Sequence, residues 1–129
     1  MFTSFCVAFA MVCQPPFEVT PTELRSMFNE ICGYTEVECD KIKVEYRRLP
    51  NQISGLAQLY NTGRMEVLLH TKNDGSMSQT RGILVHEIAH LVMFLKEGNK
   101  HRTSHGSQFR EVCKELAIKS NVSKSYCSK

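Results

Sequence analysis

Hydrophobic residues recur at the spacing of an α-helix in a stretch that begins at Leu24. The apolar positions are Leu24, Met27, Phe28 and Ile31. Intervals of three and four residues place them on one face, which predicts an amphipathic helix. The preceding Thr20-Pro21-Thr22-Glu23 has the pattern of a capping box with proline at the first helical position, and Gly33 is placed to end the helix in a left-handed conformation. We interpret this segment as a scaffold helix.

The next stretch alternates polar and apolar residues, a pattern that is typical of a strand. It runs from Lys41 to Arg48, and its inward positions are Ile42, Val44 and Tyr46. Ile53–Tyr60 and Met65–Thr71 predict two further strands, joined by a hairpin-type turn at Asn61-Thr62-Gly63. Gly55 would leave the edge of its strand bare of a side chain, so that a peptide could add there as an extra strand. A β-bulge is the alternative explanation of this glycine.

The longest apolar segment predicts a central helix from about Met77 to about Glu97, ended by Gly98. It is apolar nearly all round, which indicates a buried position. A last helix is expected to open at Ser104 or His105; its apolar residues are Phe109, Val112, Cys113 and Leu116. The predicted fold class is therefore α+β, with a sheet of three or more strands packed on the central helix between an N-terminal scaffold helix and a C-terminal helix.

Two terminal segments fall outside this pattern. Residues 1–17 form an apolar N-terminal segment followed by a linker with Pro15 and Pro16. A secretory signal is disfavoured because no Lys or Arg precedes the apolar part and cleavage after Ala10 would leave it too short. Residues 121–129 lose all periodicity and are expected to be a frayed tail. The predicted domain spans residues 18–120.

Composition adds the class of protein. A chain of 129 residues with 42% hydrophobic and 22% charged residues fits one soluble globular domain, which we expect to be a monomer. No apolar stretch has the length of a bilayer, so no membrane partner is predicted. The net charge of +3 allows contact with DNA through basic residues, but recognition of nucleic acid needs a clustered basic face.

The six cysteines could indicate three disulfides in a secreted protein. They are Cys6, Cys13, Cys32, Cys39, Cys113 and Cys127. No pair has the two-residue gap of a zinc knuckle or redox motif, and Cys32 and Cys113 fall on apolar helix faces where a reduced cysteine packs as a small hydrophobe. We therefore expect reduced cysteines and an intracellular protein, cytoplasmic or nuclear, with secretion as the alternative.

Candidate chemistry lies in the middle of the central helix, where His86-Glu87-Ile88-Ala89-His90 has the pattern H-E-x-x-H. Residues four apart on a helix are displaced by about 40° around the axis and about 6 Å along it, so both imidazoles point toward one ion. Glu87 is then placed beside the metal, where a carboxylate can act as the general base. A chance match with one buried, hydrogen-bonded histidine is the competing interpretation.

The third ligand must come from elsewhere. The metzincin pattern is excluded because Met93 and Lys96 stand where it needs Gly and His. Glu111 and Glu115 project from the polar face of the last helix, whereas His105, extrapolated back along that helix, falls on the apolar face. The sequence therefore favours a three-His site. His101 is the second candidate and His70 the third, although each is more simply a surface or hydrogen-bonded histidine.

At these residues the chain resembles the SprT-like zinc metallopeptidases, which include the DNA–protein crosslink protease Spartan. The family signature is H-E-x-x-H followed by H-G-x-x-[FW], and it is matched by His86, Glu87, His90, His105, Gly106 and Phe109. The resemblance covers about residues 18–120 and implies a zincin-like fold with one Zn²⁺ per chain on His86, His90 and His105. It also implies an endopeptidase with Glu87 as general base, acting on protein substrates that include DNA-crosslinked proteins.

The chain departs from the family pattern in its C-terminal part. Many members carry a zinc ribbon of four cysteines there, whereas this chain has only Cys113 and Cys127. DNA-dependent activation is thereby in doubt. An inactive zinc-binding homologue that binds DNA or protein and a secreted metallopeptidase remain alternatives. The oxyanion-stabilising donor is left open among His101, Arg102 and Tyr60.

Overall fold

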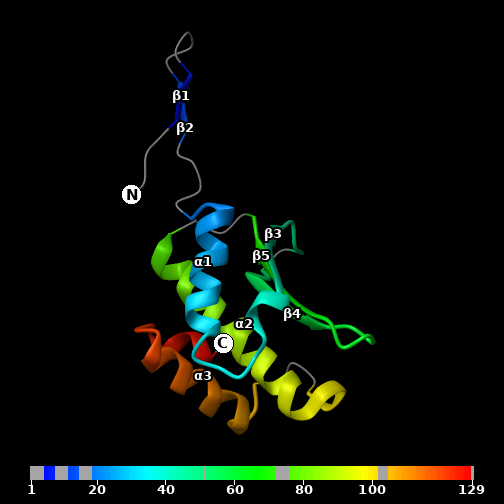
Figure 1. The fold of residues 1–129 in the computed structure, drawn as a ribbon. Coiled ribbons are helices and arrows are strands. Elements are labelled where there is room, and N and C mark those ends of the chain that lie inside the picture. Colours follow the sequence, from blue (N-terminus) through cyan, green and yellow to red (C-terminus); the bar gives the residue numbers. More distant parts are fainter. Residues whose placement is uncertain are drawn as a thin grey trace.

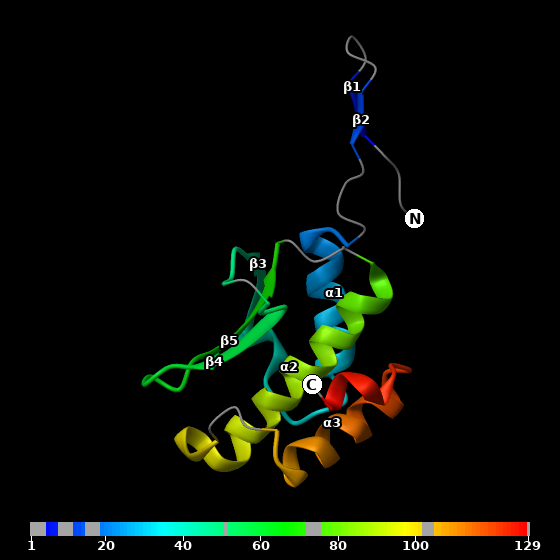
Figure 2. The ribbon, with the colours of Figure 1, turned by 180° about the vertical axis from the view of Figure 1, so that it is seen from behind.

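A single helix, α2 (Met77–Glu97), lies at the centre of the computed structural model, which describes residues 5–7, 12–14, 19–50, 52–71, 76–101 and 105–128. It contacts α1, α3 and strand β4 (Figures 1 and 2). The helix begins where the Ser76 side chain accepts a hydrogen bond from the amide of Gln79, and it ends at Gly98, with φ 58°. Both predicted ends are confirmed. Its middle is buried on all sides, as the apolar pattern predicted.

Helix α1 (Pro21–Cys32) packs against α2 and β3. Its capping box is present: the Thr20 hydroxyl accepts from the Glu23 amide at 3.1 Å, and the Glu23 carboxylate accepts from the Thr20 amide at 3.1 Å. The left-handed stop expected at Gly33 is wrong, because Gly33 keeps a right-handed φ of −61°. Tight turns continue past it instead, with the amide of Thr35 bonded to the carbonyl of Cys32.

The sheet consists of β3 (Lys43–Arg47), β5 (Met65–His70) and β4 (Gly55–Leu59), in that order. β3 is parallel to β5, whereas β4 is antiparallel to it. Within the described residues β4 therefore has one open edge. Val67 and Leu69 of β5 are fully buried in the core shared with the helices. The α+β class with a small three-stranded sheet is confirmed.

Helix α3 (Ser107–Lys119) begins later than predicted. Its N-cap is Gly106, in an extended conformation with ψ 179°, so His105 lies in the loop before the helix and not on it. The expectation that the C-terminal helix carries His105 is wrong for this reason. Between α2 and this loop, η2 (Gly98–Lys100) is a single 3₁₀ turn.

The described part of the chain beyond α3, residues 120–128, is folded and not frayed. Val122 donates a backbone hydrogen bond to the carbonyl of Ala117 at 2.9 Å, and Lys124–Cys127 forms the 3₁₀ helix η3 against α2 and α3. Cys127 is fully buried. The Cys113–Cys127 disulfide and the Ser123 cap hold this segment in place. It therefore needs no apolar stripe, and its sequence shows no helical periodicity.

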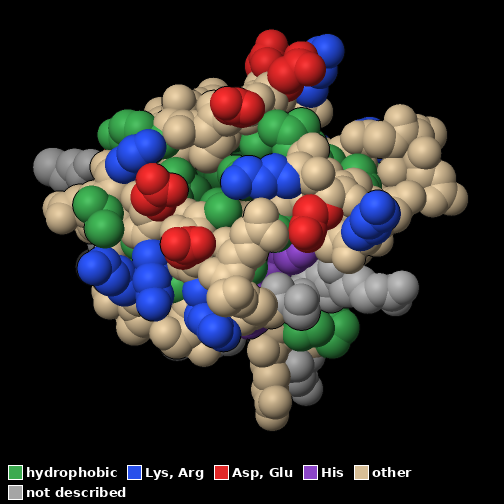
Figure 3. Space-filling view, turned by 90° about the horizontal axis from the view of Figure 1, so that it is seen from below, with side chains coloured by type: hydrophobic (Ala, Val, Ile, Leu, Met, Phe, Trp, Pro, Cys, Tyr) green, Lys and Arg blue, Asp and Glu red, His purple; other side chains and the backbone are tan. Residues whose placement is uncertain are grey.

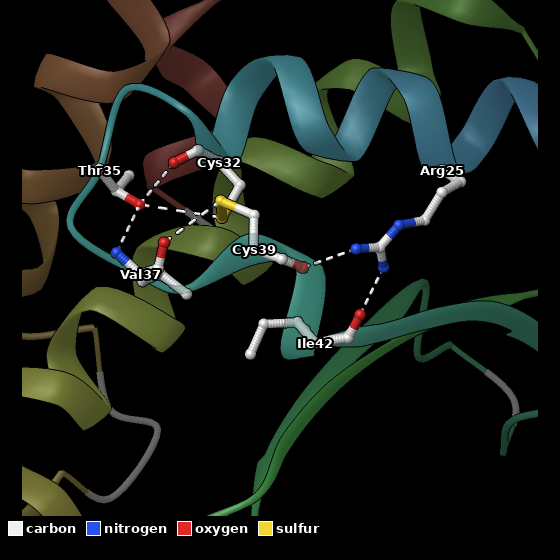
Figure 4. The surroundings of a disulfide bond; sticks show 6 residues. All are labelled: Arg25, Cys32, Thr35, Val37, Cys39 and Ile42. Carbon is white, nitrogen blue, oxygen red and sulfur yellow. Dashed lines mark hydrogen bonds between the residues drawn. A yellow bond between two sulfur atoms is a disulfide. The ribbon is translucent and has the colours of Figure 1, made fainter.

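Two disulfides join described residues, which makes the expectation of reduced cysteines at 32 and 113 wrong. Cys32 is bonded to Cys39 in η1 (Cys39–Lys41), and Cys113 is bonded to Cys127. Figure 4 shows how the loop after α1 returns Cys39 to Cys32 at the end of the helix. Nearer the start of the same helix, the Arg25 guanidinium donates to the carbonyls of Cys39 and Ile42. Spacing along the chain gave no sign of this return.

Of the N-terminal segment 1–17, the structure describes residues 5–7 and 12–14. β1 (Phe5–Val7) and β2 (Val12–Gln14) pair as an antiparallel hairpin in which Cys6 and Cys13 are register partners. Most of the predicted linker lies outside the described residues, so the boundaries of the 18–120 domain stay a prediction. Among the described residues no helix has the length and apolar character needed to cross a membrane.

Candidate metal centre

Three imidazoles converge beside the middle of α2. His86 and His90 lie one turn apart on that helix, and His105 reaches them from the loop before α3. One ring nitrogen of each lies within 4.8 Å of the others, and Nε2 of His86 is 3.1 Å from Nε2 of His105. Four tetrahedral ligands at about 2.0–2.1 Å from a zinc ion are separated by roughly 3.3 Å. The spacing therefore fits a metal ion between these nitrogens.

The protonation of these rings also suits a cation. Burial lowers the pKa of His86, and burial together with the neighbouring histidines lowers the pKa of His90 to about 3. Both rings are therefore neutral at physiological pH and offer a lone pair, which a metal ion requires of imidazole.

A hydrogen bond fixes which nitrogen of His86 carries the proton. Its Nδ1 lies 2.7 Å from the backbone carbonyl oxygen of Tyr126. A carbonyl oxygen can only accept a hydrogen bond, so Nδ1 carries the proton and Nε2 keeps its lone pair available for a metal ion. Partners of this kind orient metal-binding histidines and set their tautomer.

His90 has a side-chain partner in the corresponding place. Its Nδ1 lies 2.8 Å from Nε2 of His101, which is buried and whose own Nδ1 is 3.8 Å from a carboxylate oxygen of Glu97. With Nδ1 of His90 donating, its Nε2 is free on the side of His86 and His105. His101 was the second candidate ligand from the sequence, whereas the structure places it behind His90 and outside the group of His86, His90 and His105.

One aromatic ring supports all three histidines. Phe109 of α3 is buried, and its ring centroid lies 5.1, 4.3 and 4.9 Å from those of His86, His90 and His105. The contact with His90 is stacked. Side chains packed in this way have few alternative rotamers, so Phe109 limits where the three rings can point.

Glu87 projects into the same region from α2. The residue is 6% exposed, and burial raises the pKa of its carboxyl to about 8, opposed in part by a hydrogen bond from the backbone of Ala57 in β4. A carboxylate with a raised pKa is a stronger proton acceptor than an exposed one. Glu87 is thus held between the three imidazoles and the open edge of the sheet.

These groups share one cavity of about 440 Å³. It is bounded by β4 and the loop before it on one side and by α2 on the other. The lining residues that carry chemistry are His86, Glu87, His90, His105 and Tyr126. Histidine side chains are visible on the face of the molecule seen from below (Figure 3). The cavity itself opens to the surface and is accessible to a ligand.

The remaining candidate residues lie elsewhere. Glu111 and Glu115 are exposed on α3, as their helical phase predicted, and His70 is buried at the end of β5, outside the histidine group. Among the proposed oxyanion donors, Tyr60 donates to the Gln58 side chain at 2.9 Å, and Arg102 lies outside the described residues. Tyr126 had no predicted role, because residues 121–129 were expected to be a frayed tail.

The fold and this site together define an α+β protein with a three-histidine group that suits a transition-metal ion, whose identity the donor atoms leave open among metals that prefer imidazole. The model of the SprT-like family matches residues 22–128, nearly the whole chain. The chain therefore belongs to the SprT-like family, as the resemblance indicated. The match includes the η3 segment. A search of curated proteins finds no significant match.

Gly55 makes room for Glu87, a role that differs from the bare strand edge predicted. A Cβ at this position would lie 2.7 Å from Cγ2 of Ile83 and 3.1 Å from the Glu87 side chain. We expect Gly55→Ala to destabilise the fold by about 1–3 kcal/mol through overpacking, measured by urea denaturation. In the double variant Gly55→Ala/Ile83→Ala the cost should be smaller than the sum of the two single costs, because the clashing methyl group is gone. Additive costs would contradict the packing argument.

Proposed function

We propose that this protein is a zinc-dependent endopeptidase of the zincin type. The observation that carries the proposal is the placing of His86, His90, His105 and Glu87 around one cavity beside the edge strand β4. A purely structural metal site would need a fourth protein ligand and no cavity. Three histidines with an adjacent carboxyl and open space are the arrangement of a hydrolytic site.

The residues divide the chemistry among them. A zinc ion held there would supply Lewis-acid chemistry, lowering the pKa of a water molecule and polarising the scissile carbonyl. His86, His90 and His105 hold the ion, with Tyr126 and His101 fixing the first two rings. Glu87 accepts a proton from the attacking water and delivers it to the nitrogen of the leaving amine. The amide of Ala57 keeps the Glu87 carboxyl turned toward the cavity.

The substrate is an extended segment of protein. β4 offers an open edge along the cavity, and a peptide can pair with such an edge through backbone hydrogen bonds. Pairing of this kind needs a chain free of its own secondary structure, so unfolded or mobile segments are preferred over compact domains. On the face seen from below, Lys and Arg side chains lie among Asp and Glu and do not form a basic cluster of the kind that binds DNA (Figure 3). Cleavage of DNA-crosslinked proteins therefore needs a separate test.

Proteolysis of a denatured protein tests this function. We expect cleavage of denatured casein by the zinc-loaded chain, its loss on treatment with a chelator and its return on addition of Zn²⁺. A compact folded protein should be cut more slowly, and parallel reactions with single-stranded DNA report whether DNA stimulates cleavage. Zinc binding without cleavage of any substrate would identify an inactive zinc-binding homologue.

The two disulfides bear on the compartment. Disulfides persist in oxidising compartments and are rare in the cytosol. The intracellular location was predicted because the cysteines were expected to be reduced, and that expectation is wrong for these two pairs. We therefore favour the secreted alternative. Mass spectrometry of the protein isolated from its source without reduction should find both pairs oxidised. Free thiols at these positions would favour the cytoplasm or nucleus.

A further inference from the structure

The Tyr126 carbonyl is an unusual partner for a metal-site histidine because it comes from a short, polar segment. η3 is only four residues long and carries no apolar stripe. An isolated 3₁₀ turn of this length has little stability of its own. Other contacts must therefore keep the carbonyl 2.7 Å from Nδ1 of His86.

A covalent bond provides the first of these contacts. Cys127 directly follows Tyr126 and is bonded to Cys113, which is fully buried on α3. α3 also carries Phe109, which packs against the three histidine rings. The disulfide thus connects the partner of His86 to the helix that supports the metal site.

Contacts with α2 provide the second anchor. The Arg81 side chain donates at 2.7 Å to the carbonyl of Ser120, the C-cap of α3 from which the chain leads into η3, and pairs with Glu30 of α1 at 3.1 Å. One residue further along α2, a Cβ on Gly82 would lie 2.3 Å from the Tyr126 ring. Glycine is unfavourable inside a helix, and here its missing side chain is the space that the ring occupies. The segment is therefore fitted against α2 at the turn that precedes His86.

We propose that η3 belongs to the metal site and that Tyr126 is a positioning residue for His86. The Cys113–Cys127 disulfide holds Tyr126 in place, so that zinc affinity depends on this disulfide. The inference rests on the proposed zinc site but not on peptidase activity. Without the tether, the Tyr126 carbonyl leaves Nδ1 and His86 samples both tautomers and further rotamers. Loss of such an orienting partner lowers metal affinity by about 10–100-fold.

The test compares two disulfide-free variants of the full chain. Cys113→Ser/Cys127→Ser removes the tether, and Cys32→Ser/Cys39→Ser removes the disulfide that joins α1 to η1 and does not include η3, as the matched control. Zn²⁺ affinity is measured by competition with a chromophoric chelator, and folding is checked by circular dichroism. We expect a drop of about 10–100-fold for the first variant and less than about threefold for the second. Equal affinities in the two variants would overturn the proposal.

Two further measurements keep the outcome specific. In the zinc-free protein, ¹⁵N NMR of the imidazoles should show His86 protonated at Nδ1 in the wild type and in the control but as mixed tautomers in Cys113→Ser/Cys127→Ser, while His90 is unchanged. If that variant fails to fold, Tyr126→Ala keeps both disulfides and the backbone carbonyl at position 126 but removes the ring whose packing on Gly82 holds that carbonyl beside His86. Its zinc affinity should also fall about tenfold. An unchanged affinity and an unchanged His86 tautomer would refute the role of Tyr126, whereas a wild type that binds no zinc would instead refute the proposed function.

Discussion

Replacing Glu87 by glutamine should remove peptidase activity and leave the metal in place. The side chain keeps its shape, and its amide oxygen can still accept the hydrogen bond from Ala57. The glutamine amide cannot take up a proton from water, and general base catalysis contributes about 10²–10⁴-fold to a rate. We expect cleavage of denatured casein by Glu87→Gln to fall by at least that range, with about one zinc per chain retained.

Zinc content and folding are the controls for this variant. Glu87 is buried and has no ion pair among the described residues, so an uncharged glutamine should not destabilise the helix. Metal analysis and thermal unfolding should therefore match the wild type. Substantial activity in a clean, metal-replete preparation would show that another group moves the proton, and the assignment of Glu87 would have to be abandoned.

Removal of His105 should have the largest effect on metal binding. Its Nε2 faces that of His86 at 3.1 Å, so His105→Ala leaves the ion with two protein ligands. Changes to residues behind the ligands cost about 10–100-fold in affinity, and the loss of a ligand should cost more than about 100-fold. We expect zinc to be removed by a weak chelator from His105→Ala but not from the wild type, with loss of peptidase activity in parallel.

His101 provides the comparison that separates a ligand from its support. His101→Ala removes the partner of His90 at 2.8 Å and should lower zinc affinity only within the range for supporting residues, about 10–100-fold. Glu111→Gln, on the exposed side of α3, should have no effect. A greater loss in His101→Ala than in His105→Ala would make His101 the third ligand.

Local signals in the sequence were sufficient for α2 and for the edge of the sheet. The bounds of α2 could be predicted from residue types alone: a serine at the N-cap, an apolar run, and a glycine at position 98, where the structure has a positive φ. β3 alternates polar and apolar residues, whereas β5 is buried from Glu66 to His70. The parallel pairing of β3 with β5 could not be seen in the sequence, because it depends on how α1 and α2 cover the sheet. The histidine group was predictable because a helix fixes the relation between His86 and His90.

The errors concern residues whose neighbours are distant in the chain. Cys32 and Cys113 lie on apolar helix faces, as predicted, but an apolar face does not reveal whether a second cysteine packs against it. Tyr126 contacts His86 through its backbone, which no residue type can signal. Two clues were present: a glycine inside the central helix at position 82, and the separation of 14 residues between the last two cysteines.

The position of η3 in the chain has a consequence for the order in which the site matures. A ribosome delivers α2 with His86 and His90 first, His105 next, and Tyr126 with Cys127 last. On the proposed arrangement, a nascent chain holds its ligands before it holds the clamp that orients them. On the same proposals it binds zinc weakly until residue 127 has left the ribosome and an oxidant has closed the disulfide, so that peptidase activity would also come last.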